Sequence, residues 1–563
     1  MFKTITAPMP LGAAVTAAPA APANNPARRA TEQKQPAQKP HQPLLCDVVL
    51  QLVDRYRYWL FLLVAAFYVA AFNGQWRMEP DAALYLSIGR NLAHGLGFTY
   101  LGRPNHLAYP GWPSLIAITF KLFGTASLIP VHVVMLLLAW AALALTYRLF
   151  LLHSGRPTAV MVTLGLGMTK TFFCYGFELW SDMPFTVGVM AFLAGYEALM
   201  RRAEIRAAQR TGDAPARERP RVYWYDWLLL VAGLGTAIVM RPTMWPLLAA
   251  IFATIAYRAI RRQMRWKTLA VAAALLVVFA AVVLMMDPRR SASHEQFGDV
   301  YERAMLQRFT AGPPGALRQQ ILQNVDDLVR RAASDALVEL RAGPINPMLG
   351  LLVLALGVSL LFSRPLWGLW FCFLMATLLL TTPIVRYFLP VIPLLVYAWW
   401  KTMVALNRKL PRPWGNIALA VLMTFGTAVN GSKIIGVITQ QRRAPFLNTY
   451  DRGTYAAVPD VARRLKSTVD NNAMVFARAP YGRVLSYLSQ RAVVGTRETP
   501  VEILQKHKIY VLEPVGEDVR LLLLVLGLRE TPGIFTILPP KHAGPNACAM
   551  TLHGTTPIAG AAP

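Results

Sequence analysis

Long runs of apolar residues, separated by short polar stretches, fill most of this chain between residues 58 and 437. The first run is Tyr58–Asn73, and the others lie near 127–150, 158–177, 183–200, 227–240, 243–258, 268–286, 346–362, 366–382, 385–403 and 415–437. Many runs approach the roughly 20 residues that a helix needs to cross the hydrocarbon core of a bilayer. The pattern predicts an all-α polytopic membrane protein with about 11 transmembrane helices.

The segment after the first run has an amphipathic pattern instead. Residues 76–98 read "WRMEPDAALYLSIGRNLAHGLGF", with apolar residues every four positions at Leu84, Ile88, Leu92 and Leu96. Pro80 suits the first turn of a helix, and Asp81 would then lie where the helix dipole favours a carboxylate. We expect an interfacial helix on the membrane surface. A helix that only covers the bundle is the alternative.

Two further segments depart from the pattern of simple spans. Residues 109–124, "YPGWPSLIAITFKLFG", are apolar but short and interrupted by proline, which favours a re-entrant or tilted helix packed on protein. From about residue 445, short apolar runs such as "AMVFA", "AVVGT", "IYVLE" and "FTILP" alternate with helical stretches at Val458–Val469 and Val501–His507. This predicts a small C-terminal α/β domain. The apolar stretch 519–528 is too short to span and is expected to be a buried helix.

The charge distribution gives the chain a predicted orientation. The formal net charge is +28, yet the basic residues gather in short loops between apolar runs, as the positive-inside rule expects of cytoplasmic loops. Nucleic acid is therefore not an expected partner. Residues 1–44 are predicted to be a disordered cytoplasmic tail, 45–440 a transmembrane catalytic domain with external loops 76–126 and 287–344, and 441–563 an external, periplasmic domain. The four cysteines show no spacing typical of a zinc site or a disulfide framework.

Ionisable residues on the predicted outer side form the candidate site. They lie at the start of the interfacial helix and at the outer ends of spans: Glu79, Asp81, His106, Glu178, Asp182, Arg241 and Arg386. Charges of both signs at membrane depth are costly, so their clustering indicates function. Arginine can hold a phosphate leaving group, and a carboxylate can take the proton of a hydroxyl. Because water-soluble nucleotide sugars are made inside the cell, an outer site favours glycosyl transfer from a lipid carrier.

The same residues carry a resemblance to a known family. The order "EPDAALYLSIGRNLAHGLGF…YPGWPSLIAITFKLFG…ELWSDMPFTVGVMAFLAGYEALMRR…GLGTAIVMRPTMWPLL…RYFLPVIPLL" resembles the GT-C membrane glycosyltransferases over roughly residues 58–405. The likeness is strongest to the branch of dolichyl-phosphate-mannose protein mannosyltransferases and aminoarabinose lipid A transferases. It implies a GT-C-like fold and an inverting transfer of a sugar from a polyprenyl phosphate.

The resemblance also implies roles for single residues. The acid of the family's first external loop acts as or near the catalytic base, which falls on Asp81, and a second external acid falls on Asp182. The family commonly shows a double proline with a nearby basic residue, whereas this chain splits the prolines in "NHLAYPGWP" and offers His106. We expect the donor phosphate at Arg386, Arg241 and His106. The vicinity of substrate or metal is expected to include Glu79, Glu178, Tyr85 and Tyr387, and a divalent cation stays open as a cofactor.

The expected partners are a polyprenyl-phosphate sugar donor, membrane lipids and an envelope acceptor, which could be lipid A or its core, another glycan or a protein. The basic bias and the scarcity of cysteine favour a bacterial inner membrane. Alternatives stay open at this level: a transporter or flippase of a lipid-linked sugar, or a non-catalytic scaffold. Asp182 could be a helix cap, Arg241 and Arg386 could be snorkelling residues, and Tyr85 and Tyr387 could belong to the aromatic belt.

The predicted orientation can be tested with reporter fusions. We expect a fusion at residue 45 to report the cytoplasm, and fusions at residue 320 and at the C-terminus to report the outer side, because the basic loops alternate in that way. A cytoplasmic C-terminus would contradict the external site.

Overall fold

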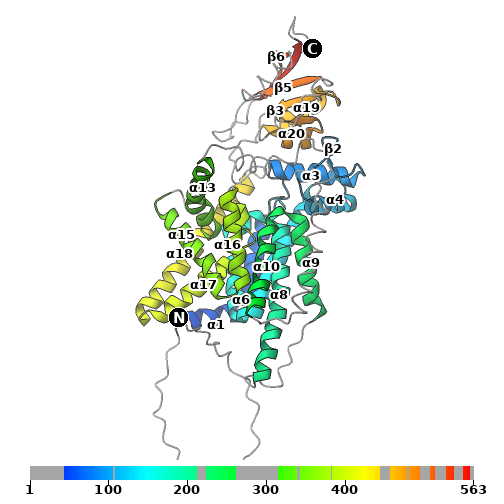
Figure 1. Cartoon of the computed structure of the whole chain (residues 1–563). Coiled ribbons are helices and arrows are strands. Elements are labelled where there is room, and N and C mark those ends of the chain that lie inside the picture. Colours follow the sequence, from blue (N-terminus) through cyan, green and yellow to red (C-terminus); the bar gives the residue numbers. More distant parts are fainter. Residues whose placement is uncertain are drawn as a thin grey trace, which may run out of the picture. The chain divides into compact units, whose positions relative to one another are not determined.

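The computed structural model describes residues 44–105, 108–211, 223–261, 315–338, 343–381, 383–443, 457–477, 481–494, 508–513, 528–537 and 550–557. Three predictions fall outside these residues: the disordered tail, the span at 268–286 and the helix Val501–His507. The stretch 519–527 is also outside them. Figure 1 shows how the elements are arranged in space, with colours that follow the chain from blue to red.

Four of the described helices are long and apolar enough to cross a membrane. They are α5 (Ile129–Ser154), the part Asp182–Arg206 of α8 (Asp182–Thr211), α15 (Ile345–Ser359) with its 3₁₀ extension η4 (Leu360–Phe362), and most of α18 (Arg412–Arg443). Shorter apolar helices accompany them: α2 (Arg57–Ala71), α4 (Gly111–Phe123), α9 (Trp224–Met240), α10 (Trp245–Ile260) and α16 (Pro365–Leu380). The fold is that of a helical membrane protein.

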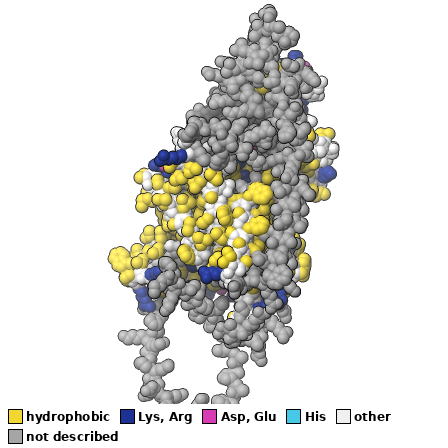
Figure 2. All heavy atoms as spheres, in the orientation of Figure 1, with side chains coloured by type: hydrophobic (Ala, Val, Ile, Leu, Met, Phe, Trp, Pro, Cys, Tyr) yellow, Lys and Arg dark blue, Asp and Glu magenta, His cyan; other side chains and the backbone are white. Residues whose placement is uncertain are grey.

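Exposed apolar side chains cover the bundle where lipid would meet it. Figure 2 shows a broad band of hydrophobic side chains on one face, with Lys and Arg side chains at its margins. On α15 and α18 the band includes large exposed residues: Met348, Leu351, Phe362, Ile417, Val421 and Phe425. Aromatic residues are exposed near the starts of α2, α9 and α18, namely Tyr58, Trp59, Trp224, Trp227 and Trp414, as expected of residues at a membrane interface.

The structure corrects two predicted boundaries and adds one helix. The run 158–177 is two helices, α6 (Arg156–Gly167) and α7 (Lys170–Tyr175), because the backbone is extended at Thr169. The run 385–403 begins as a 3₁₀ turn, η5 (Val385–Phe388), and α17 spans only Ile392–Lys409. Pro390 separates the two elements, since proline lacks the N–H that a continuous helix would need there. An unpredicted helix, α1 (Leu45–Arg55), precedes α2.

The predicted interfacial helix is present as α3 (Pro80–Ala93), and Pro80 is in its first turn as expected. Its Leu84 and Ile88 are buried in a small cluster with the hairpin of β1 (Thr99–Tyr100) and β2 (Arg103–Pro104), whereas Leu86 belongs to the main core. The helix is therefore buried on more than one side. Leu96, expected to end the apolar stripe, lies beyond the helix and is 64% exposed.

Helices α8 and α9 approach each other closely through glycine. A Cβ atom added to Gly195 would lie 2.6 Å from the backbone O of Asp226 and the backbone N of Leu230, and Gly233 on α9 is equally confined against α8. Small residues let helix backbones meet in this way. The close contact brings the first residue of α8, Asp182, near the residue after α9, Arg241.

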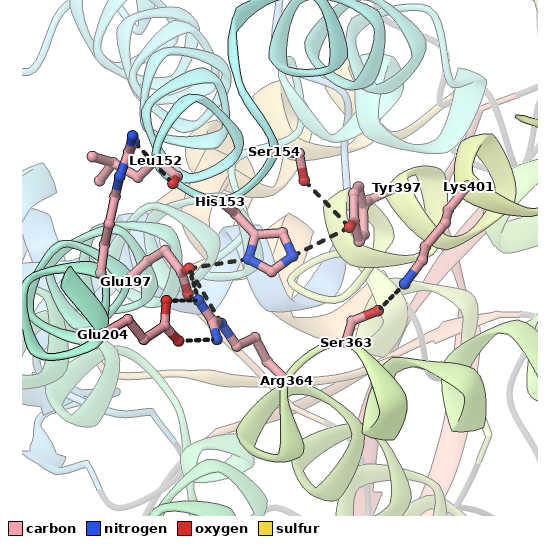
Figure 3. A network of polar contacts seen from close by, with 10 residues as sticks. Leu152, His153, Ser154, Glu197, Glu204, Ser363, Arg364, Tyr397 and Lys401 are labelled. Carbon is pink, nitrogen blue, oxygen red and sulfur yellow. Dashed lines mark hydrogen bonds and ion pairs between the residues drawn. The ribbon is translucent and has the colours of Figure 1, made fainter. Parts of the chain in front are cut away.

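A polar network ties the helices together far from Asp182. Glu197 on α8 lies about 22 Å along the helix axis from Asp182, at 1.5 Å per residue. Figure 3 shows its carboxylate between His153, whose Nδ1 is 3.0 Å from Oε1, and Arg364, whose Nη2 donates to Oε1 at 2.6 Å. His153 Nε2 lies 3.2 Å from the hydroxyl of Tyr397 on α17. The network therefore joins α5, α8 and α17 at one end of the bundle.

The C-terminal part contains a mixed sheet with two helices, α19 (Val458–Thr468) and α20 (Tyr481–Ser489). The strand order is β4-β3-β5-β7-β6. The strands are β3 (Met474–Ala477), β4 (Ala492–Val494), β5 (Ile509–Glu513), β6 (Leu528–Ile537) and β7 (Met550–Pro557). β3 is parallel to β4 and β5, whereas β7 is antiparallel to β5 and β6. The four short apolar runs expected to be strands all contribute to this sheet.

The glycine contact between α8 and α9 predicts a large effect from one added side chain. Gly195→Leu should force the two backbones apart and destabilise the protein by about 1–3 kcal/mol, the usual range for overpacking. Gly235→Leu on α9 is the matched control, because an added Cβ at Gly235 meets nothing within 4 Å. Denaturant unfolding of the purified protein in detergent measures both, and equal stability of the two variants would contradict the close contact.

Candidate active site

Asp81, in the first turn of α3, lies between two arginines from distant parts of the chain. Arg386 Nη1 donates to Asp81 Oδ2 at 2.7 Å, and Arg483 Nη1 donates to Asp81 Oδ1 at 3.2 Å. Arg386 is on η5 and Arg483 on α20. The Asp81 side chain keeps 34% of its surface exposed, so each carboxylate oxygen has an arginine partner while the group stays accessible.

The segment before Arg386 is held by a neighbouring helix. In α13 (Ala316–Asp327), Asn324 Nδ2 donates to the carbonyl oxygens of Leu379 at 2.8 Å and Thr381 at 3.1 Å. These carbonyls belong to the end of α16, where they have no partner within the helix. A π-helical turn, η3 (Leu328–Ala332), and α14 (Ala333–Leu337) follow α13. The predicted external loop 287–344 therefore contains helices that support the approach to η5.

Asp182 and Arg241 form a second, more deeply buried ion pair. Arg241 Nη1 contacts Asp182 Oδ1, and the two side chains are 10% and 3% exposed. Asp182 is the first residue of α8, and Arg241 lies between α9 and the 3₁₀ turn η2 (Pro242–Met244). The acid thus begins a helix, as the cap interpretation expected, and also neutralises an arginine. Arg241 is buried against protein and does not snorkel to water.

Aromatic rings lie under both arginines. The guanidinium carbon of Arg241 is 5.1 Å from the ring centroid of Tyr387, and that of Arg386 is 5.4 Å from the same ring and 5.2 Å from the ring of Trp180. These distances are typical of cation–π contacts. Tyr85 OH and Ser181 Oγ lie 3.3 Å apart. Tyr85 and Tyr387 therefore belong to the cluster.

Two buried donors of this cluster have no acceptor among the described residues. They are Arg386 Nε and Trp180 Nε1. A buried N–H without an acceptor is destabilising by about 1–3 kcal/mol, so such donors indicate a place where a ligand oxygen or a water can bind. Both belong to side chains in contact with each other.

The arginines set the ionisation of the acid beside them. Burial raises the pKa of the Asp81 carboxyl, but the charges of Arg386 and Arg483 outweigh burial and hold that pKa below its ordinary value. Burial and the neighbouring Asp81 raise the pKa of the Tyr85 hydroxyl. Burial, and then the charge of Arg386, lowers the pKa of Arg241. Asp81 is therefore ionised and Tyr85 neutral at pH 7.

The other predicted site residues are not part of the two ion pairs of Asp81 and Asp182. Glu178 is buried with Arg77, whose Nη1 is 3.9 Å from Glu178 Oε1. Glu79 is the N-cap residue of α3 and is partly buried. His106 lies outside the described residues. Within the described ranges, no three His, Cys, Asp or Glu side chains are grouped so as to hold a metal ion.

Sequence reasoning missed Arg483 and Trp180. Arg483 lies 402 residues after Asp81, in the predicted periplasmic domain, and no local pattern links it to the first external loop. Trp180 stands between Glu178 and Asp182 in "ELWSD", so its place beside two candidate acids was the available signal.

The buried pair predicts that Asp182 supports the fold as well as the site. Asp182→Asn should lower the free energy of unfolding by about 3–5 kcal/mol, because it leaves Arg241 buried without its counter-charge. Asp81→Asn is the comparison variant and should cost less, since Asp81 is more exposed. Denaturant titration in detergent measures both, and an unchanged stability of Asp182→Asn would contradict the structural role.

Sequence comparisons find no relative: no family model and no curated protein matches the chain. Solved structures, in contrast, do match the chain. ArnT from Cupriavidus metallidurans bound to undecaprenyl phosphate superposes with a TM-score of 0.51 at 11% identity, over 90% of this chain and 99% of that chain. ArnT from the same organism in the apo state gives a TM-score of 0.50 at 12% identity, over 88% and 97% of the two chains.

At this level of identity the likeness is one of fold. It extends over nearly the whole of ArnT, a member of the GT-C superfamily. The predicted resemblance is therefore confirmed at the level of the fold: this chain has the fold of ArnT.

Proposed function

We propose that the protein is a membrane glycosyltransferase that moves a sugar from a polyprenyl-phosphate carrier to a hydroxyl group of a cell-envelope acceptor. The observation that carries the proposal is the arrangement around Asp81. A carboxylate that is ionised and accessible is paired with Arg386, and the buried Nε of this arginine has no acceptor among the described residues. Asp81, which can accept a proton, and Arg386, which can bind phosphate, therefore lie side by side.

The charges of the cluster favour an anionic ligand. Arg241, Arg386 and Arg483 face the carboxylates Asp81 and Asp182, so three positive charges meet two negative ones. A lipid phosphodiester carries one negative charge and would balance this excess. Arginine binds phosphate through parallel N–H donors, and Trp180 Nε1 offers a further donor beside Arg386.

The reaction can be written with these residues in named roles. The acceptor hydroxyl gives its proton to a carboxylate oxygen of Asp81, and its oxygen attacks the anomeric carbon of the sugar. The bond between that carbon and the phosphate oxygen breaks, and the electron pair leaves with the polyprenyl phosphate. Attack from the side opposite the phosphate inverts the anomeric carbon. Arg386 stabilises the charge that develops on the departing phosphate.

The neighbouring fold is consistent with such a donor. ArnT from Cupriavidus metallidurans has been solved bound to undecaprenyl phosphate, a polyprenyl phosphate. By analogy, the lipid chain would lie along the apolar bundle with its phosphate at the cluster. The basic loops of the sequence support an outer, periplasmic position for this end of the protein, in a bacterial inner membrane. The donor sugar and the acceptor, whether glycolipid, glycan or protein, are left unassigned.

In this proposal, arginine supplies the positive charge for the leaving phosphate. Within the described residues, the acids of the cluster are paired with arginines and are not joined by further His, Cys, Asp or Glu ligands.

Mass spectrometry of envelope glycolipids and glycoproteins, from cells with and without the chain, tests the function. We expect one acceptor to lose an increment of hexose or pentose size. The purified protein should restore this increment when given polyprenyl-phosphate sugars. A transporter would move the lipid-linked sugar without modifying an acceptor, and a scaffold would have no activity when purified; either result would contradict the proposal.

The role of Asp81 predicts a specific kinetic defect. Asp81→Asn keeps the size of the side chain but cannot take a proton, so kcat should fall about 10²–10⁴-fold while donor binding persists. Asp81→Glu should recover little, because its oxygen is displaced by about 1 Å. Asp460→Asn is a matched control, since Asp460 is likewise an acid in the first turn of a helix, α19, but pairs with Arg463 on that same helix. If Asp81→Asn transferred sugar at a near-normal rate, Asp81 would not be the catalytic base.

A further inference from the structure

Helix α20 of the C-terminal sheet region packs directly on the site helix α3. The ring of Tyr487 meets the ring of Trp76 edge to face, with centroids 5.2 Å apart. Arg90 on α3 lies over the Tyr487 ring at 5.0 Å and donates from Nη1 to the Tyr487 carbonyl at 3.3 Å. These contacts fix α20 against α3 without involving Asp81.

Arg483 projects from the same face of α20, because residues four apart on a helix are neighbours. One turn before Tyr487, it reaches Asp81 Oδ1 at 3.2 Å. The side chains of Val484 and Leu485 are fully buried, so they hold α20 in position. Arg483 is therefore delivered to the site by a well-packed helix and not by a loose surface side chain.

The two arginines that bind Asp81 differ in their surroundings. Arg386 contacts Trp180 and Tyr387 and carries the buried Nε donor assigned above to the donor phosphate. Arg483 contacts Asp81 through the other oxygen and belongs to α20. A phosphate bound at Arg386 Nε brings a second anion to that guanidinium and weakens the bond from Nη1 to Asp81 Oδ2. The bond to Arg483 can then persist on Oδ1.

We propose that Arg483 is a positioning residue, which holds Asp81 Oδ1 so that Oδ2 is turned toward the acceptor hydroxyl once the donor phosphate engages Arg386. This inference rests on the proposed function and deepens it, since it makes the C-terminal region a part of the catalytic site. A base must be aligned closely with the proton that it accepts, and a misplacement of about 1 Å can cost about 10²-fold in rate.

The charged and titratable groups around Asp81 define what Arg483 adds. Arg386 on η5 and Arg241 after α9 also face it, Tyr85 lies one turn along α3, and Asp182 is paired with Arg241. All of these remain when Arg483 is replaced. Because the positive charge of Arg483 helps to lower the pKa of Asp81, its removal should raise that pKa, and activity should then be lost at a higher pH during acidification.

The test uses the full-length protein in the transfer assay. We expect Arg483→Gln to lower kcat about 10–100-fold, by a larger factor than any rise in the KM for the donor lipid, and to move the acidic limb of the kcat profile to higher pH. Arg483→Lys keeps the positive charge, so its acidic limb should stay near that of the wild type while kcat recovers only in part. Arg90→Gln is the control, because it weakens the packing of α20 without touching Asp81.

A double-mutant comparison separates positioning from other effects. If Arg483 acts through Asp81, then Arg483→Gln should have no further effect on the residual rate of Asp81→Asn. Equal losses for Arg90→Gln and Arg483→Gln, or a pH profile that does not move, would overturn the inference in favour of simple packing. So would full activity of Arg483→Gln beside an inactive Asp81→Asn, which would leave the proposed function intact. If Asp81→Asn itself were active, the proposed function would fail first.

Discussion

A buried arginine needs a buried carboxylate, and the predicted outer end of this bundle is arranged around that requirement. Arg241 follows α9 and meets Asp182 at the start of α8. Its guanidinium also covers the ring of Tyr387, which is the residue after Arg386. The pair thus fixes two helix ends and the 3₁₀ turn η5 together. Without this contact, Arg386 would lose the support that directs it at Asp81.

In the proposed reaction, the arginines around Asp81 serve two opposing demands. They keep the carboxylate ionised, but a carboxylate with a lowered pKa is also a weaker base. A phosphate that binds Arg386 would withdraw part of this positive influence and strengthen the base at the moment when the donor is in place. The arrangement would then couple donor binding to proton transfer through electrostatics, with no change of the backbone.

The sequence was sufficient for features that depend on local patterns. Apolar patterns located α3, α5, α8 and the strands β3, β4, β5 and β6, and Pro80 marked the start of α3, whereas β7 was not predicted. The sequence did not predict where tertiary contacts or the backbone break a helix. Examples are Thr169, between α6 and α7, and the 3₁₀ turn before α17. The pairing of Asp81 with Arg386 could be anticipated only as a shared side of the membrane. Arg483 could not be found, because no periodicity relates α20 to α3.

The position of α3 beneath α20 has a consequence for how the protein is made. Asp81 leaves the ribosome 305 residues before Arg386 and 402 residues before Arg483. The apolar helices can insert one after another as synthesis proceeds, yet the carboxylate has both arginine partners only after α20 has been made and folded. Such long-range closure is slow relative to local helix formation. Assembly of the nascent chain is therefore completed at the site itself, and a product truncated before α20 would keep its membrane helices but lack Arg483 beside Asp81.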